Sequence, residues 1–208
     1  MTGLPNALTI LRIVLVPVYA ILFVLPGDLA RITAFLVFAT ASISDWLDGF
    51  AARKLKAGSD FGRMLDPIAD KVLIAVALML LVAEGTFARF DPDTGNSTFS
   101  LLRLVPALII LAREILVSGL REFLAKTRVS VPVTAVAKVK TAVQMIAIGT
   151  MILTPLATKY FPGIPGKSYL AVAYFLLWGA AALTVYTGVI YFRNGMAYIK
   201  PGPSPAGD

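Results

Sequence analysis

The chain contains no cysteine and no histidine among its 208 residues. The lack of cysteine excludes disulfides and thiol nucleophiles, and the lack of both residues excludes a Cys/His zinc site. Imidazole is absent as a general base, so proton abstraction falls to a carboxylate or, less readily, to a lysine or tyrosine. Any metal must bind through oxygen ligands, which favours hard cations such as Mg²⁺ or Mn²⁺.

Charged residues are also scarce. They make up 15% of the chain against 58% for hydrophobic residues, whereas soluble globular domains have about 25% charged residues. A chain of this length cannot bury so much apolar surface in a soluble core. This composition excludes a soluble enzyme, a disordered chain and a coiled coil. The formal net charge of +7 suits a neighbourhood of anionic lipid headgroups or a substrate that carries phosphate.

Six apolar stretches approach the length of about 20 residues that a membrane-spanning helix needs. We predict spans at residues 8–25, 32–52, 64–83, 101–124, 139–156 and 169–192. The turn-rich segments 87–99 and 159–167 are expected to be loops, and residues 201–208 a disordered tail. The predicted fold is therefore an all-α integral membrane protein with a single domain over residues 1–200. The first span has no basic residue before Arg12 and no cleavage pattern after it, so we expect it to be retained rather than removed as a signal peptide.

Lysine and arginine residues gather at one end of the predicted spans, which identifies that end as cytoplasmic. Both termini are then expected in the cytoplasm. Because these basic residues are dispersed among span ends, the sequence does not favour a nucleic-acid partner. The basic residues assigned to the cytoplasmic side are Arg53, Lys54, Lys56, Arg63, Arg121, Lys126, Arg128, Lys138, Lys140, Arg193 and Lys200.

Four carboxylates fall in the second and third predicted spans. Asp45 and Asp48 are three residues apart and Asp66 and Asp70 four apart, so each pair shares one face of its helix. The short joining loop predicts antiparallel neighbours, with the four carboxylates converging in a polar cavity open to the cytoplasm. An aspartate at the centre of a span costs about 2.5–3.5 kcal/mol, and mutual repulsion adds to this cost. Two divalent cations would remove the repulsion among the four carboxylates. The alternative for a single aspartate is that its side chain reaches the membrane–water interface or pairs with a neighbouring basic side chain.

The spacing of these residues is that of a known signature. Asp45-x-x-Asp48-Gly49-x-x-Ala52-Arg53, followed after eight residues by Gly62-x-x-x-Asp66-x-x-x-Asp70, resembles the CDP-alcohol phosphatidyltransferases at every fixed position. Enzymes of this family transfer a phosphatidyl group from a CDP-linked lipid to an alcohol and release CMP. The resemblance runs from about residue 4 to about residue 148. It implies a six-span membrane fold, usually a homodimer, which agrees with the independent span count.

The resemblance also implies roles for individual residues. Asp45, Asp48, Asp66 and Asp70 would hold two divalent cations, Mg²⁺ or Mn²⁺, and Asp70 would be the general base for the acceptor hydroxyl. Asn6 and Thr9 would close the nucleotide and diphosphate site from the N-terminal segment. The residues that match this site are Asn6, Thr9, Asp48, Gly49, Ala52, Arg53, Ser59 and Gly62.

Further segments resemble the branch of the family whose acceptor is sn-glycerol 3-phosphate, most clearly the stretch at residues 112–115. The implied reaction joins CDP-diacylglycerol and sn-glycerol 3-phosphate, in a bacterial inner membrane with the site facing the cytoplasm. The acceptor carries a phosphate and needs a cationic pocket, for which the candidates are Arg113, Arg121, Lys138 and Lys140. Arg113 lies well inside a span, where a guanidinium is costly unless it meets an anion. That anion is either the acceptor phosphate or a neighbouring group such as Glu114.

Two alternatives stay open at the level of sequence. Serine, inositol phosphate or phosphatidylglycerol could replace glycerol phosphate as acceptor in the same fold, and of these inositol phosphate would also need basic residues. Carboxylates inside spans also mark cation pathways, so a cation transporter is the second alternative. A transporter is expected to place acidic groups near mid-bilayer. Here they cluster at one end beside Arg53 and Arg63.

Overall fold

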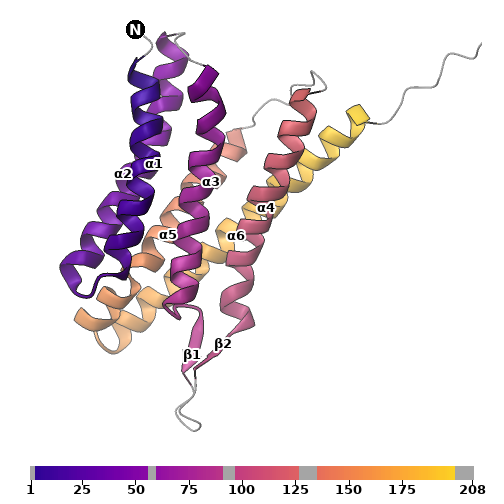
Figure 1. Ribbon diagram of the computed structural model, residues 1–208. Coiled ribbons are helices and arrows are strands. Elements are labelled where there is room, and N and C mark those ends of the chain that lie inside the picture. The colour runs from indigo at the N-terminus through magenta and orange to yellow at the C-terminus, as the bar shows by residue number, and fades with distance from the viewer. Residues whose placement is uncertain (1–2, 56–59, 91–96, 127–134, 200–208) are drawn as a thin grey trace, which may run out of the picture.

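The computed structural model describes residues 3–55, 60–90, 97–126 and 135–199. Within these residues the chain forms six helices and one two-stranded hairpin (Figure 1). The elements are α1 (Gly3–Val24), α2 (Asp28–Leu55), α3 (Asp60–Ala83), β1 (Ala88–Phe90), β2 (Ser97–Phe99), α4 (Leu101–Lys126), α5 (Ala135–Tyr160) and α6 (Ile164–Ile199). Five of the six predicted spans lie inside one helix, and the first, residues 8–25, ends one residue beyond α1, so the helical fold class is confirmed.

Two segments differ from the expected loops. Residues 87–99 contain the antiparallel pair β1–β2, in which Arg89 lies opposite Thr98, because β-favouring residues flank the turn-rich centre of the segment. Only residues 161–163 separate α5 from α6. Pro165 is compatible with the start of α6, because N–H groups in the first turn of a helix have no hydrogen-bond partner within that helix. A side chain at Gly166 would place its Cβ 2.5 Å from the carbonyl oxygen of Phe161, so the tight turn requires glycine there. The sixth helix also continues to Ile199, beyond the predicted end at residue 192.

The helices alternate in direction along the bundle (Figure 1). The end of α2, the start of α3, the end of α4, the start of α5 and the end of α6 all lie at the end where the chain begins, which we call the carboxylate end. The hairpin and the α1–α2 and α5–α6 turns lie at the opposite, hairpin end. The most extensive helix pairs are α5 with α6, α1 with α2, and α4 with α6. Helices α2 and α3 touch each other, but both pack more extensively on α1, so the predicted direct pairing of α2 and α3 is a minor contact.

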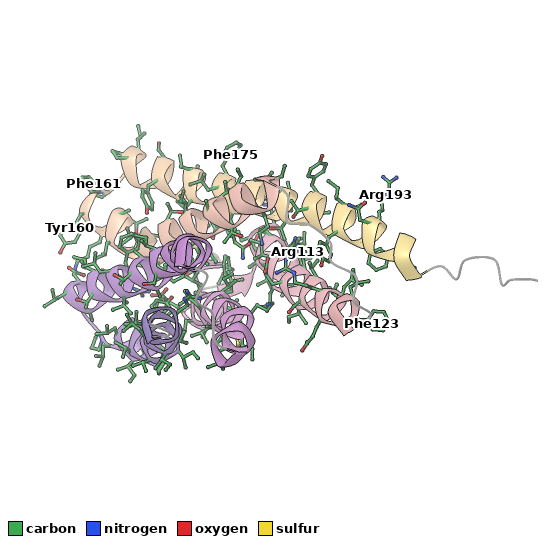
Figure 2. All side chains as sticks on the ribbon, turned by 90° about the horizontal axis from the view of Figure 1, so that it is seen from above. Arg113, Phe123, Tyr160, Phe161, Phe175 and Arg193 are labelled. Atoms are coloured by element: carbon green, nitrogen blue, oxygen red, sulfur yellow. The ribbon has the colours of Figure 1, made fainter. Side chains whose placement is uncertain are left out.

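Large apolar side chains fill the centre of the bundle and also cover its outside. Tyr19 of α1 and Phe38 of α2 are buried in the centre, with ring centroids 5.7 Å apart. In contrast, Phe123, Phe161 and Phe175 point outward (Figure 2) and are 51%, 62% and 78% exposed. Every helix of the bundle presents exposed apolar residues of this kind. Such an exterior is typical of a surface that meets lipid rather than water.

Among the described residues, two helical segments are long and apolar enough to cross a membrane: Val139–Tyr160 and Ile164–Met196. Shorter apolar helical segments cover Ile10–Val24 and Lys71–Ala83. Helix α4 carries the predicted site residues Arg113 and Arg121 together with Glu114, and these charges lower its hydropathy. These charges therefore weaken the membrane signal of α4.

Polar contacts tie the helices together at the hairpin end. Lys159 donates a hydrogen bond of 2.6 Å to Asp28, Tyr160 donates to the same carboxylate, and Arg31 pairs with Glu84. The hydrogen bond from Lys159 holds the pKa of Asp28 below its usual range, so this contact persists at neutral pH. A cavity of about 520 Å³ opens between these groups. It is lined by none of the predicted site residues, which belong to other parts of the bundle.

Candidate functional site

The helices bring the signature carboxylates to the same end of the bundle. Asp45 lies ten residues before the end of α2 at Leu55, and Asp70 lies ten residues after the start of α3 at Asp60. At about 1.5 Å per residue, both positions are about 15 Å from the helix end. Because α2 and α3 are uninterrupted helices here, Asp45 and Asp48 share one face of α2, and Asp66 and Asp70 share one face of α3. The structure thus places the two pairs at matching depth, while their side chains lie outside its described part.

The other signature residues are placed by backbone only. Helix α1 carries Asn6 and Thr9 in its first part, and α2 and α3 carry Gly49, Ala52, Arg53 and Gly62. Ser59 lies outside the described residues, and Lys138 is placed in α5 without a described side chain. The predicted nucleotide and diphosphate contacts of these residues therefore stay predictions.

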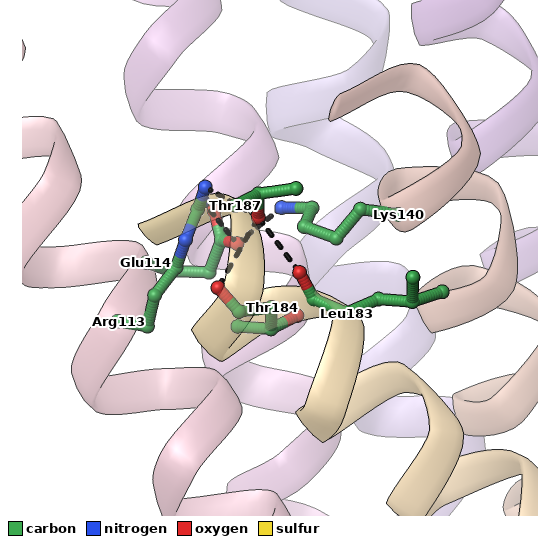
Figure 3. A network of polar contacts seen from close by, with 6 residues as sticks. All are labelled: Arg113, Glu114, Lys140, Leu183, Thr184 and Thr187. Atoms are coloured by element: carbon green, nitrogen blue, oxygen red, sulfur yellow. Dashed lines mark hydrogen bonds and ion pairs between the residues drawn. The ribbon is translucent and has the colours of Figure 1, made fainter. Parts of the chain in front are cut away.

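A largely buried polar cluster joins α4, α5 and α6 (Figure 3). Glu114 Oε1 accepts a hydrogen bond of 2.5 Å from Lys140 Nζ and one of 3.1 Å from Arg113 Nη1. Arg113 Nη2 donates to Thr187 Oγ1 at 3.1 Å. The side chains of Arg113, Glu114 and Lys140 are only 15%, 13% and 6% exposed. We call these four residues the α4–α6 polar cluster; it contains two of the predicted acceptor-binding residues, Arg113 and Lys140.

The α4–α6 polar cluster carries more positive than negative charge, because two cations share one carboxylate. Arg121, two turns after Arg113 on α4, adds electrostatic repulsion at Lys140. Arg121 itself is exposed, and its guanidinium lies 5.7 Å from the ring centroid of Tyr191. Buried cations without matching anions are unfavourable. An arrangement of this kind is suited to bind an anion with several oxygen atoms, such as a phosphate.

Several buried polar atoms around the cluster have no hydrogen-bond partner within the described structure. They are Nε of Arg113, Oγ1 of Thr184, and both Nε2 and Oε1 of Gln144. Thr184 and Gln144 are completely buried. Polar groups in protein interiors are nearly always hydrogen-bonded, so unpaired ones call for a partner such as a ligand or a water molecule.

Sequence reasoning gave no role to Thr184, Thr187, Gln144 or Arg12. The threonines carry no charge, and only their position in the folded bundle reveals them. Arg12 of α1 is fully buried, one turn after Thr9. Its signal in the sequence is the same as that of Arg113, a basic residue within an apolar span.

Gly188 of α6 makes room for Arg113. A Cβ atom at this position would lie 3.1 Å from Cγ and 3.4 Å from Nε of Arg113, so that side chain would have to shift by a few tenths of an ångström. We expect Gly188→Ala to raise the KM for the phosphate-bearing acceptor by about 3- to 10-fold, an effect of about 1 kcal/mol typical of overpacking. Gly179→Ala on the same helix is the matched control, since no atom lies within 4 Å of its added Cβ. Equal KM values for the two variants would contradict a positioning role for this contact.

Several known proteins are similar to this chain over most of its length. The profile of the family described as CDP-alcohol phosphatidyltransferase matches residues 2–186, well beyond the point near residue 148 where the motif resemblance ends. A Rickettsia bellii protein named CDP-diacylglycerol–glycerol-3-phosphate 3-phosphatidyltransferase is 42% identical over 94% of this chain and 97% of its own length. Proteins of the same name from Pseudomonas fluorescens and Escherichia coli K12 are 37% and 35% identical, over 95% and 94% of this chain and 92% and 96% of theirs.

Proposed function

This chain belongs to the CDP-alcohol phosphatidyltransferase family, and from that premise we propose that it transfers the phosphatidyl group of CDP-diacylglycerol to sn-glycerol 3-phosphate. The products are phosphatidylglycerophosphate and CMP, and the reaction is a step of phospholipid biosynthesis. The full-length relatives carry the name of this enzyme. The structural observation that supports the acceptor is the α4–α6 polar cluster, in which the largely buried Arg113 and Lys140 share a single carboxylate, that of Glu114. An acceptor with its own phosphate supplies a net negative charge, whereas serine has no phosphate and its carboxylate is balanced by its own ammonium group.

Two divalent cations, Mg²⁺ or Mn²⁺, fit the donor set of this chain. Asp45, Asp48, Asp66 and Asp70 offer only carboxylate oxygens, the ligands that these ions prefer, and stand at matching depth on α2 and α3. When bound, the cations neutralise the diphosphate of the lipid substrate and stabilise the departing CMP.

The chain's own residues then bind, orient and deprotonate the substrates. Asp70, which matches the position of the general base in the family, removes the proton from the primary hydroxyl of the acceptor, and a carboxylate base is also compatible with a chain that lacks histidine. The hydroxyl oxygen bonds to the phosphorus that carries the lipid, and the bond from this phosphorus to the CMP oxygen breaks. Arg113 and Lys140 hold the acceptor phosphate, with Arg121 and Lys138 adding positive charge. The nucleotide and diphosphate are bound by Asn6, Thr9, Asp48, Gly49, Ala52, Arg53, Ser59 and Gly62.

We further propose a six-span protein of the bacterial inner membrane, with residues 1–200 as one domain and a homodimer as the assembly. The apolar exterior of every helix supports six spans, as do helices of 22 to 36 residues, each long enough to cross about 30 Å of hydrocarbon. The excess of basic residues at the carboxylate end supports a cytoplasmic site that opens there, with both termini on the same side. The same basic residues disfavour a cation pathway at this end.

CMP release tests the proposed function. We expect detergent-purified protein with CDP-diacylglycerol and Mg²⁺ to release CMP only when sn-glycerol 3-phosphate is added. Parallel reactions contain serine, inositol phosphate or phosphatidylglycerol. Release with one of these acceptors alone would discard the acceptor assignment and keep the family. Folded protein that releases no CMP with any alcohol would favour the cation transporter, which a liposome flux assay then measures.

A further inference from the structure

Gln144 is a completely buried, uncharged polar side chain near the site. It is 0% exposed on α5, and neither Nε2 nor Oε1 of its amide has a hydrogen-bond partner within the described structure. Burial of an unpaired amide is costly, and an apolar residue would fill this position of an apolar bundle without that cost. The amide therefore points to a partner that binds at this position.

Gln144 lies between the two parts of the proposed site, which are the α4–α6 polar cluster and the signature carboxylates. One turn toward the start of α5, on the same face, stands Lys140, which belongs to the α4–α6 polar cluster. The next residue, Met145, accepts a contact of 3.5 Å from the hydroxyl of Ser42 on α2, and Ser42 precedes Asp45 by a single turn. At the level of Gln144, α5 is thus in contact with the part of α2 that carries the signature carboxylates.

The acceptor of the proposed reaction has a matching order of groups. In sn-glycerol 3-phosphate the phosphate and the reacting hydroxyl stand on the two end carbons, and the second hydroxyl stands on the carbon between them. If the α4–α6 polar cluster holds the phosphate and the carboxylates face the reacting hydroxyl, the middle hydroxyl reaches the level of Gln144.

The chemistry of an amide distinguishes between possible partners. A phosphate only accepts hydrogen bonds, so it would satisfy Nε2 and leave Oε1 facing a negative charge. A metal cation would satisfy only Oε1. A hydroxyl donates one hydrogen bond and accepts another, and so can satisfy both atoms.

We propose that Gln144 binds the hydroxyl on the central carbon of the acceptor, and so determines that the acceptor is a glycerol phosphate rather than a simpler hydroxyalkyl phosphate. This inference rests on the proposed function. Thr184, also fully buried and unpaired, lies one turn deeper in α6 than Thr187 of the α4–α6 polar cluster, on the same side of that helix. It offers a second hydroxyl at a comparable depth of the bundle.

The test compares two acceptors, sn-glycerol 3-phosphate and 3-hydroxypropyl phosphate, which lacks the central hydroxyl but keeps the phosphate and a primary alcohol. We expect the wild-type protein to prefer glycerol phosphate in kcat/KM by about 100-fold or more, since sites built to bind a hydroxyl strongly reject analogues without it. Gln144→Met, of similar volume but apolar, should lower kcat/KM for glycerol phosphate by about 30- to 100-fold and leave that for 3-hydroxypropyl phosphate within about 3-fold. The KM for CDP-diacylglycerol should not change.

The control is Thr154→Val, which removes another buried hydroxyl of α5, one that donates within its own helix to the carbonyl of Thr150. It should keep the wild-type preference between the two acceptors. A Gln144→Met variant that keeps this preference, or loses activity equally with both acceptors, would overturn the inference and leave Gln144 with a structural role. Wild-type protein that uses neither acceptor would instead overturn the proposed function itself. If Gln144→Met does not fold, Gln144→Asn keeps an amide but shortens its reach, and should lower the preference between acceptors in the same direction.

Discussion

Asp70→Asn is expected to abolish measurable CMP release, with kcat lowered by about 10³-fold or more. The carboxamide cannot take the proton of the acceptor hydroxyl, and it removes one negative charge from the four carboxylates of α2 and α3. Removal of a general base also changes the pH profile, because hydroxide then takes over the proton transfer. The residual activity of Asp70→Asn should therefore rise steadily with pH, whereas the wild-type rate should level off once the carboxyl group is ionised.

Asp93→Asn is a matched control for this change. Asp93 lies outside the described residues, and the chain places it between β1 and β2, which belong to the hairpin end of the bundle. The variant should retain wild-type kcat and the wild-type pH profile. If folded Asp70→Asn keeps more than about a tenth of the wild-type kcat, the assignment of the general base is wrong, because such bases contribute about 10²-fold or more.

Arg113→Met should raise the KM for sn-glycerol 3-phosphate by about 100-fold, with little change in the KM for CDP-diacylglycerol. A hydrogen bond to a charged group contributes about 1.5–3 kcal/mol, and each 1.4 kcal/mol corresponds to about a tenfold change in affinity. The variant also leaves Glu114 paired with Lys140 alone, which reduces the positive charge available to the phosphate. Initial rates at varied concentrations of each substrate separate the two KM values.

Arg103→Met on the same helix provides the comparison. Arg103 lies at the hairpin end, where Nη1 donates a hydrogen bond of 2.9 Å to the carbonyl oxygen of Ala88. Its loss should lower thermal stability without changing the KM for the acceptor by more than about 3-fold, since the hydrogen bond contributes only about 1–3 kcal/mol to folding. Similar KM values for the two variants would exclude a direct role of Arg113 in acceptor binding.

The sequence by itself determined the helical architecture and the family. Apolar runs of roughly 20 residues coincide with the helices that form, because a span must match the thickness of a bilayer. The spacing of Asp45, Asp48, Asp66 and Asp70 also defined which carboxylates share a helix face, since helical periodicity depends only on position along the chain. The same reasoning identified Arg113 as unusual, because the cost of a charge in a span does not depend on the neighbouring helices.

Only the tertiary structure decided which helix faces meet. Lys140 reaches Glu114 from 26 residues away, and Thr187 receives a hydrogen bond from Arg113 across 74 residues, and no local pattern encodes such pairs. The packing of α1 against both α2 and α3, rather than a close α2–α3 pair, also depends on how the side chains of three helices fit together. The unpaired amide of Gln144 is visible for the same reason, since burial and the lack of a partner are properties of the assembled bundle rather than of one helix.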